Sequence, residues 1–170
     1  MEADPDLYTT DILAWSEQQA GALRELAARR DLPNALDLTH VAEEIEDVGQ
    51  SELNAVKSFI RLVLRHAVKC LVSPDTPSVR HWHVEISNWQ TELEDRVSPS
   101  MRRKIDMDFL WDRAVRQAEL DVRAWEGNDT MLTAVAALRG TACPVTLDTL
   151  LSDPAEPALL VERIEQAMRG

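Results

Sequence analysis

The stretch that decides the fold is residues 37–72, DLTHVAEEIEDVGQSELNAVKSFIRLVLRHAVKCLV. Its apolar residues recur every three or four positions, the spacing that places side chains on one face of an α-helix. We predict one long amphipathic helix, or two in line, whose inward stripe comprises Val41, Ile45, Val48, Leu53, Val56, Ile60, Val63, Ala67, Cys70 and Leu71. Gly49 interrupts this pattern at a cost of about 1 kcal/mol relative to alanine, which indicates a kink or a close helix crossing.

The same periodicity recurs on both sides of this stretch. It predicts helices over about 11–29, 79–97 and 99–127, followed by short helices near 130–139, 147–151 and 157–168. Pro33, the Ser73–Ser78 segment and Ser98–Pro99 separate the long helices. The predicted fold is all-α: an antiparallel up-down helix bundle of four long helices with short C-terminal helices. We expect residues 1–9 to be a flexible N-terminus and residues 10–170 to form one domain.

Composition narrows the function classes. The net charge is −12, so a nucleic-acid backbone would be repelled and nucleic acid is not an expected partner. Cys70 and Cys143 lack the number and spacing of a disulfide framework, and the acidic N-terminus lacks the features of a signal peptide. Charged residues break the most apolar segment, 60–72, so no membrane span is expected. We therefore expect a cytoplasmic protein.

A metal site is one candidate for chemistry. His66 and His83 lie about equally far from a turn centred near Asp75, so an antiparallel hairpin would bring them to one level, with Cys70 one turn closer to the loop. His66, His83 and Cys70 are therefore the most coherent ligand set for a divalent metal. The alternative is that each is a packing residue, since the doubled Glu-x-x-His motif of di-iron bundles is absent.

Carboxylates crowd the first half of the long helix. Glu43 and Glu44 are candidate functional carboxylates that could hold a cation or meet a basic partner, although a solvated helix face is the more common explanation of such a pattern. Glu44 borders the apolar stripe, so we expect it to be partly buried against an arginine. Neither a nucleophile motif nor a glycine-rich phosphate loop appears, so no cofactor is expected besides a possible divalent metal.

The five tryptophans fall mostly on the apolar stripes and are expected to pack in the core, with each indole N–H bonded to a local acceptor. Trp111 lies off the main stripe. It is therefore a candidate for an exposed contact surface.

Several strings together resemble a bacterial family, domain of unknown function 29. They are Tyr8-x-x-Asp11-x-x-x-Trp15, LTHVAEEIEDVGQSE (38–52), Leu64-x-His66-x-x-Lys69, Trp82-x-x-x-Ile86, Ser98-Pro99-Ser100 and CPVTLDTLL (143–151). The resemblance covers roughly residues 8–151. The chain departs from the family pattern at Gln90, where an arginine is expected, and at Val115, where an aromatic residue is expected. The resemblance implies a helical bundle and no particular activity.

Two functions remain open on this basis. The first is a non-enzymatic protein-interaction or regulatory module, in which an acidic helical surface engages a partner protein or a second copy of the chain. The second is a metal-binding bundle or DinB-like metal-dependent hydrolase that uses His66 and His83.

Overall fold

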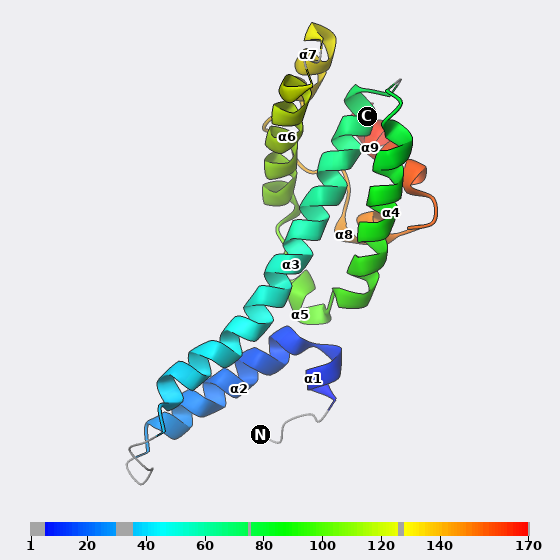
Figure 1. Ribbon diagram of the computed structural model, residues 1–170. Helices are drawn as coiled ribbons and strands as arrows, with labels where there is room; N and C mark the ends of the chain where they lie inside the picture. The colour runs from blue at the N-terminus through cyan, green and yellow to red at the C-terminus, as the bar shows by residue number, and fades with distance from the viewer. Residues whose placement is uncertain (1–5, 30–35, 75, 126–127, 170) are drawn as a thin grey trace. The chain divides into compact units, whose positions relative to one another are not determined.

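The computed structural model describes residues 6–29, 36–74, 76–125 and 128–169, and every regular element within these ranges is a helix (Figure 1). The all-α prediction is confirmed. The elements are α1 (Leu7–Thr10), α2 (Ile12–Ala27), α3 (Leu38–Val72), α4 (Val79–Arg96), α5 (Pro99–Arg102), α6 (Met107–Ala124), α7 (Asp129–Ala137), α8 (Leu147–Leu151) and α9 (Pro157–Arg169).

The chain forms two compact units. The first comprises residues 1–56 and 96–105, and the second comprises residues 57–95 and 106–170. Helix α3 contributes its first half to the first unit and its second half to the second unit. Helix α2 belongs to the first unit and α4 and α6 belong to the second, and one domain over residues 10–170 stays a prediction.

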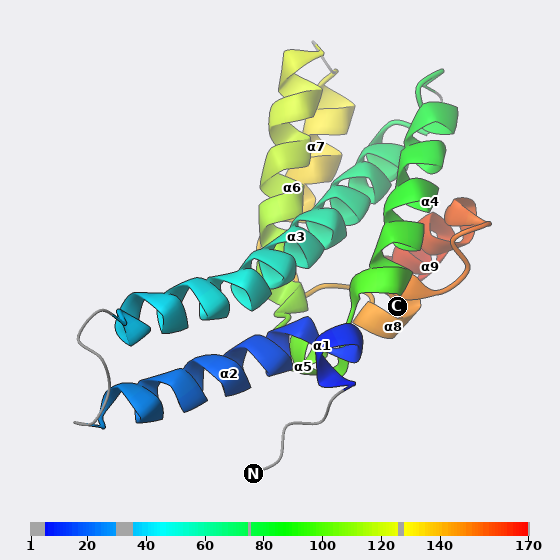
Figure 2. The ribbon, with the colours of Figure 1, turned by 60° about the horizontal axis from the view of Figure 1, so that its bottom comes forward.

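In the first unit, α2 and the first half of α3 form an antiparallel hairpin, and both views show them side by side (Figures 1 and 2). Ser16 lies against Gly49 near one end of the pair, and Arg24 bonds Glu46 further along it at 2.5 Å. Helix α3 continues through Gly49 without a break. Gly49 therefore marks a close helix crossing, one of the two alternatives that the sequence left open.

The buried face of this part of α3 differs from the predicted stripe. Ala42, Gly49 and Leu53 are buried, whereas Val41 and Val48 are 46% and 45% exposed. Small residues face α2 because the two backbones approach too closely for valine at these positions. The prediction that Val41 and Val48 face inward was wrong.

In the second unit, α3 runs antiparallel to α4, with Lys69 against Trp82. It also packs against α6, where Arg65 donates two hydrogen bonds of 2.6 Å to the carboxylate of Asp121. The residues buried in this unit include Ile60, Val63, Leu64, Ala67, Val68, Trp82, Ile86, Leu93, Leu110, Trp111, Ala114, Val115, Ala118, Val122, Val135, Leu150, Leu160 and Ile164.

The segment predicted as one helix over 99–127 is two helices, α5 and α6. Asp106 caps α6 by accepting a hydrogen bond from the backbone N–H of Phe109 at 3.0 Å. The interruption resets the helical phase, so that Trp111 is fully buried and donates from its indole to Thr141, whereas Phe109 is exposed. The expectation of an exposed Trp111 was wrong.

Gln90, where the resemblance led us to expect an arginine, is fully buried on α4. Its side-chain amide donates to the carbonyl oxygens of Leu150 at 2.7 Å and Ser152 at 3.2 Å. Gln90 therefore links α4 to the end of α8 without an acidic partner.

The remaining differences concern element ends. Helix begins at Leu7, inside the segment expected to be a flexible N-terminus. The predicted stops at Pro33 and Gly127, together with Asp75 of the α3–α4 turn, lie outside the described residues. No described helix is both long and apolar enough to cross a membrane.

Candidate functional site

His66 lies inside the second unit, on the face of α3 that meets α4. Its Nδ1 contacts the carbonyl oxygen of Leu62 at 3.0 Å, and its Nε2 contacts Oε2 of Glu85 at 3.0 Å. The indole of Trp89 packs edge-on against the imidazole, with 4.8 Å between ring centroids. His81, one turn before Glu85, approaches the same carboxylate oxygen at 3.4 Å. The structure therefore places Glu85, which sequence reasoning missed, at the centre of the histidine cluster.

His83 does not join this cluster because the register of the hairpin differs from the one predicted. His66 faces Glu85 and Lys69 faces Trp82. The residue opposite His66 is therefore two positions further along α4 than the predicted His83. Two residues correspond to about 200° of helical rotation, so His83 projects away from the face that meets His66. Burial lowers the pKa of His83.

Cys70 is buried one turn beyond His66, and its burial raises the pKa of the thiol to about 12. The thiol stays protonated at neutral pH, whereas the thiolate is the form that attacks or binds metal. Among the described residues, no three His, Cys, Asp or Glu side chains gather in a way that could hold a metal ion. The structure thus does not bring His66, His83 and Cys70 together as a ligand set.

The His66–Glu85 contact can hold and exchange a proton. Both neighbours of the imidazole, the Leu62 carbonyl and the Glu85 carboxylate, are acceptors, yet a neutral imidazole donates from only one nitrogen. Burial and the positive charge of Lys69 nevertheless lower the pKa of His66 from 6.5. The neutral ring is therefore favoured in the folded protein.

We expect this lowered pKa to appear as pH-dependent stability. The unfolded chain binds a proton on His66 more readily than the folded one, so stability should fall as the pH decreases from about 6.5 towards the folded pKa. In urea titrations between pH 5 and pH 8, the free energy of unfolding of H66Q should depend on pH less steeply than that of the wild type, by up to about 1.4 kcal/mol per pH unit. Because the pKa of His83 is also lowered, H66Q should keep some pH dependence of stability in the same direction. An unchanged slope in H66Q would contradict this assignment.

The candidate carboxylates Glu43 and Glu44 lie in the first unit, on α3, and both are exposed. Glu44 does border apolar residues, being three positions after Val41 and four before Val48. The expectation that Glu44 is partly buried against an arginine was wrong. The arginine contact belongs to Glu46, which bonds Arg24.

The Arg24–Glu46 contact identifies the two edges of the α2–α3 hairpin. On α3, Glu46 lies on one side of the buried residues and Val41 and Val48 on the other. On α2, Arg24 likewise lies on one side of the buried residues and Leu26 on the other. Because Arg24 bonds Glu46, the polar sides of the two helices share one edge and their apolar sides share the other.

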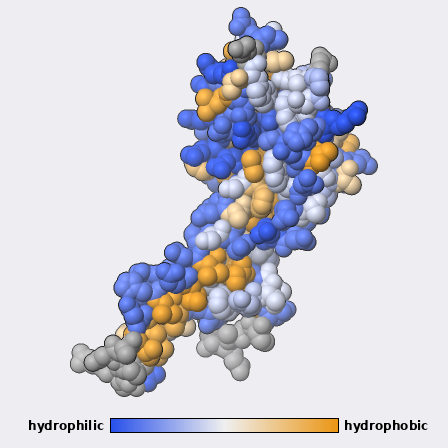
Figure 3. Space-filling model, viewed as in Figure 1, coloured by the Kyte–Doolittle hydropathy of each residue, from blue (hydrophilic) through white to orange (hydrophobic). Residues whose placement is uncertain are grey.

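This second edge is a continuous apolar surface, which we call the apolar edge. Figure 3 shows hydrophobic atoms in a band along α2 and the first half of α3. Val41 and Val48 are exposed, and the other members are half-buried. The apolar edge comprises Leu23, Leu26, Val41, Ile45 and Val48. It is a candidate binding surface of the first unit. The exposure of Val41 and Val48 could not be predicted from helical periodicity.

Another ionic cluster that the sequence did not indicate is structural. Glu119 on α6 is 4% exposed and pairs with Arg123 at 2.7 Å and with Arg139. Burial acts to raise the pKa of Glu119, but the hydrogen bond from Arg123 is the larger effect, and together with Arg139 it lowers that pKa. This cluster joins α6 to the end of α7 and leaves no group free for chemistry.

Known proteins share the sequence pattern and the fold of this chain. The pattern of the family described as Domain of unknown function DUF29 matches residues 7–154. A solved α-helical protein of unknown function from Rhodospirillum rubrum is similar over 92% of this chain and 96% of its own, with 33% sequence identity and a TM-score of 0.78. No curated protein matches the chain.

The chain is thus a member of an all-helical family, and that family is Domain of unknown function DUF29. The resemblance over residues 8–151 is confirmed.

Proposed function

We propose that this protein is a non-enzymatic interaction module whose apolar edge binds a basic amphipathic helix of a partner protein. The observation that carries the proposal is the exposure of Val41 and Val48 on a hairpin edge where the neighbouring side chains are also apolar. Contiguous apolar surface of this kind marks interaction sites in proteins, whereas a single exposed valine would not.

The shape of the surface favours a helix as its occupant. Val41, Ile45 and Val48 repeat at i, i+4 and i+7 on α3, and Leu23 and Leu26 run alongside them on α2. Two antiparallel helices leave a shallow groove between their ridges, into which a third helix can pack. An amphipathic helix would fill such a groove with anchors at the same three-to-four residue spacing.

Charge favours a basic partner. Glu44 borders the exposed valines, whereas Glu52, one turn beyond Val48, already pairs with Arg96 at 3.2 Å. The whole chain carries a net charge of −12. A second copy would bring like charges together, whereas lysine or arginine flanking an apolar helix face would be attracted.

A defined peptide tests the surface directly. We expect a fluorescent leucine–lysine amphipathic helix to bind the full chain at about micromolar affinity, and a leucine–glutamate helix of the same length to bind at least about tenfold more weakly. The double variant V41S/V48S should lose at least about tenfold in affinity for the basic peptide. V84S removes an equally apolar side chain, 55% exposed on α4, and should bind as the wild type does.

Charge reversal at neighbouring positions provides a second control. E44K places a positive charge beside the apolar edge and should weaken binding of the basic peptide, whereas E43K lies about 200° from Val41 and should have a much smaller effect. Equal losses in E44K and E43K would show that the peptide senses only net charge, which would overturn the proposal. So would a dimer in light scattering that V41S/V48S dissociates, because it would make a second copy the occupant.

A further inference from the structure

The second unit contains a cavity that is separate from the histidine cluster. It has a volume of about 570 Å³ and is lined by residues from the α3–α4 turn, α4, the end of α6 and the start of α7. This volume lies in the range of small-molecule sites. The lining residues are Ser73, Thr76, Ser78, Trp82, Trp125, Asn128 and Met131.

Two stacked indoles form the apolar part of the lining. The rings of Trp82 and Trp125 are 5.2 Å apart and inclined by 16°. Trp125 is 45% exposed although it is a large apolar side chain, so one wall of the cavity is open to an incoming ring. Flat aromatic surfaces bind other planar rings through offset stacking and edge contacts.

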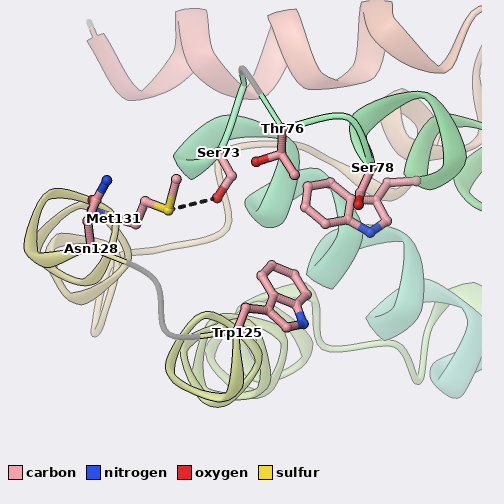
Figure 4. A pocket seen from close by; sticks show the side chains of 7 residues that line it. Ser73, Thr76, Ser78, Trp125, Asn128 and Met131 are labelled. Carbon is pink, nitrogen blue, oxygen red and sulfur yellow. Dashed lines mark hydrogen bonds between the residues drawn. The ribbon is translucent and has the colours of Figure 1, made fainter.

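Hydroxyl groups form the polar part of the lining. Figure 4 shows the side chains of Ser73, Thr76 and Ser78 across the cavity from Trp125. Ser73 is 1% exposed, and among the described residues its hydroxyl donates only to the thioether of Met131 at 3.5 Å, a weak acceptor. A buried hydroxyl with so weak a partner is available to a ligand oxygen.

A buried ammonium group, that of Lys69, lies beside the indoles that line this cavity. The ammonium of Lys69 lies 4.5 Å from the ring centre of Trp82 and 5.1 Å from that of Trp125. Lys69 is 5% exposed and forms no ion pair with any residue that the structure describes. Burial lowers the pKa of Lys69, while the charges of Asp121 and Glu85 act to raise it, so these carboxylates offset the ammonium charge only in part. A cation in the cavity would therefore be repelled by the remaining positive charge of Lys69 beside the indoles.

Two helix N-termini adjoin the cavity, although Asp129 in the first turn of α7 offsets part of the positive charge at that helix end. Ser78 immediately precedes α4, and Asn128 caps α7 by accepting from the backbone N–H of Met131 at 2.9 Å. Both residues line the cavity. The N-terminal end of a helix carries partial positive charge, which favours an anionic ligand group.

We propose that this cavity binds a small planar aromatic molecule that carries a carboxylate or similar anionic group. The ring packs against Trp82 and Trp125. The anionic group accepts hydrogen bonds from the hydroxyls and the Asn128 amide, within the field of Lys69 and the two helix ends.

A series of naphthalene derivatives that differ only in charge tests both parts of the proposal on the full chain. By calorimetry we expect 2-naphthoate to bind with a dissociation constant below about 1 mM, and 2-naphthol to bind more weakly. The 2-naphthylmethylammonium ion should bind at least about tenfold more weakly than 2-naphthoate. Equal binding of the cation and the anion would overturn the proposal, as would no saturation by 2-naphthoate at about 1 mM.

Variants locate the binding and its charge preference. W125A, which truncates a partly exposed side chain, should abolish binding of 2-naphthoate, whereas F109A removes an exposed aromatic side chain of α6 that does not line the cavity and should have no effect. K69M keeps the apolar stem without the charge and should reduce the preference for the anion over the cation to within about twofold. Two results would contradict the site. One is that W125A still binds 2-naphthoate, and the other is that K69M folds as the wild type does and keeps the same preference for the anion over the cation.

Discussion

Replacing Asp11 with alanine should lower the free energy of unfolding of the first unit by about 3 kcal/mol, because one buried carboxylate satisfies the starts of two helices. Asp11 accepts from the backbone N–H of Ala14 at 3.1 Å, which caps α2. It also accepts from the hydroxyls of Ser98 at 2.8 Å and Ser100 at 2.5 Å, and from the backbone N–H of Ser100 at 2.8 Å, at the start of α5. D11A leaves these donors buried without an acceptor.

The variant D106A serves as the control for D11A, because it removes a helix cap that serves one helix alone. Asp106 also caps a helix, but it is exposed, so its loss should cost only about 1 kcal/mol. Urea titration gives both values, and hydrogen exchange should show that D11A loses amide protection in α2 and α5. A cost for D11A no larger than that for D106A would refute the shared role.

Asp11 also predicts a loss of stability in acid. Burial acts to raise its pKa, but the hydrogen bonds from Ser100, Ser98 and Ala14 together outweigh burial and lower the pKa below 3.8. The ionised form is thus favoured in the folded protein. This contribution should be complete above the unfolded value of 3.8 and should disappear as the pH falls through the folded pKa. It should be absent from D11A.

Replacing Gly49 with alanine should destabilise the α2–α3 hairpin by about 2 kcal/mol, although alanine is the better helix former by about 1 kcal/mol. A Cβ at this position would lie 2.0 Å from Oγ of Ser16 and 2.9 Å from Cα of Leu13, so the helices must move apart. The same change at Gly21 on α2 meets no atom within 4 Å. G21A should therefore stabilise the protein by about 0.5 to 1 kcal/mol.

Thermal or urea unfolding tests this pair of variants, because G49A should lower the free energy of unfolding and G21A should raise it. In the S16A/G49A double variant, loss of the Ser16 hydroxyl removes the shortest contact, so part of the stability should return. The Leu13 backbone contact stays and limits that recovery. G49A as stable as the wild type would show that the crossing tolerates a wider separation.

Much of the fold could be predicted from local sequence. Helix α3 was predicted over 37–72 and begins at Leu38, and α4 and α8 were also placed within a residue or so of their observed ends. Capping residues and prolines act within a few positions of the helix end that they set, so their effect is readable along the chain. The break at Asp106 was missed because the apolar residues around it continue a plausible helical period.

The candidate sites were less predictable. His66 was predicted to lie level with His83 as a metal-ligand candidate, but its partner on α4 is Glu85. A shift of two residues in the α3–α4 register was enough to exchange them, and hydrophobic periodicity does not specify register that closely. The Trp82, Trp125 and Lys69 group joins three helices, so no local pattern could indicate it.

The sequence by itself determined that the chain is helical, where most helices begin and end, and to which family it belongs, because these properties depend on neighbours three or four positions apart and on strings of residues in order. Only the tertiary structure decided which flank of each helix is covered. Gly49 allows α2 so close that Ala42 and Leu53 are buried while Val41 and Val48 stay exposed. That outcome depends on the distance between two backbones, a quantity that helical periodicity in one segment does not contain.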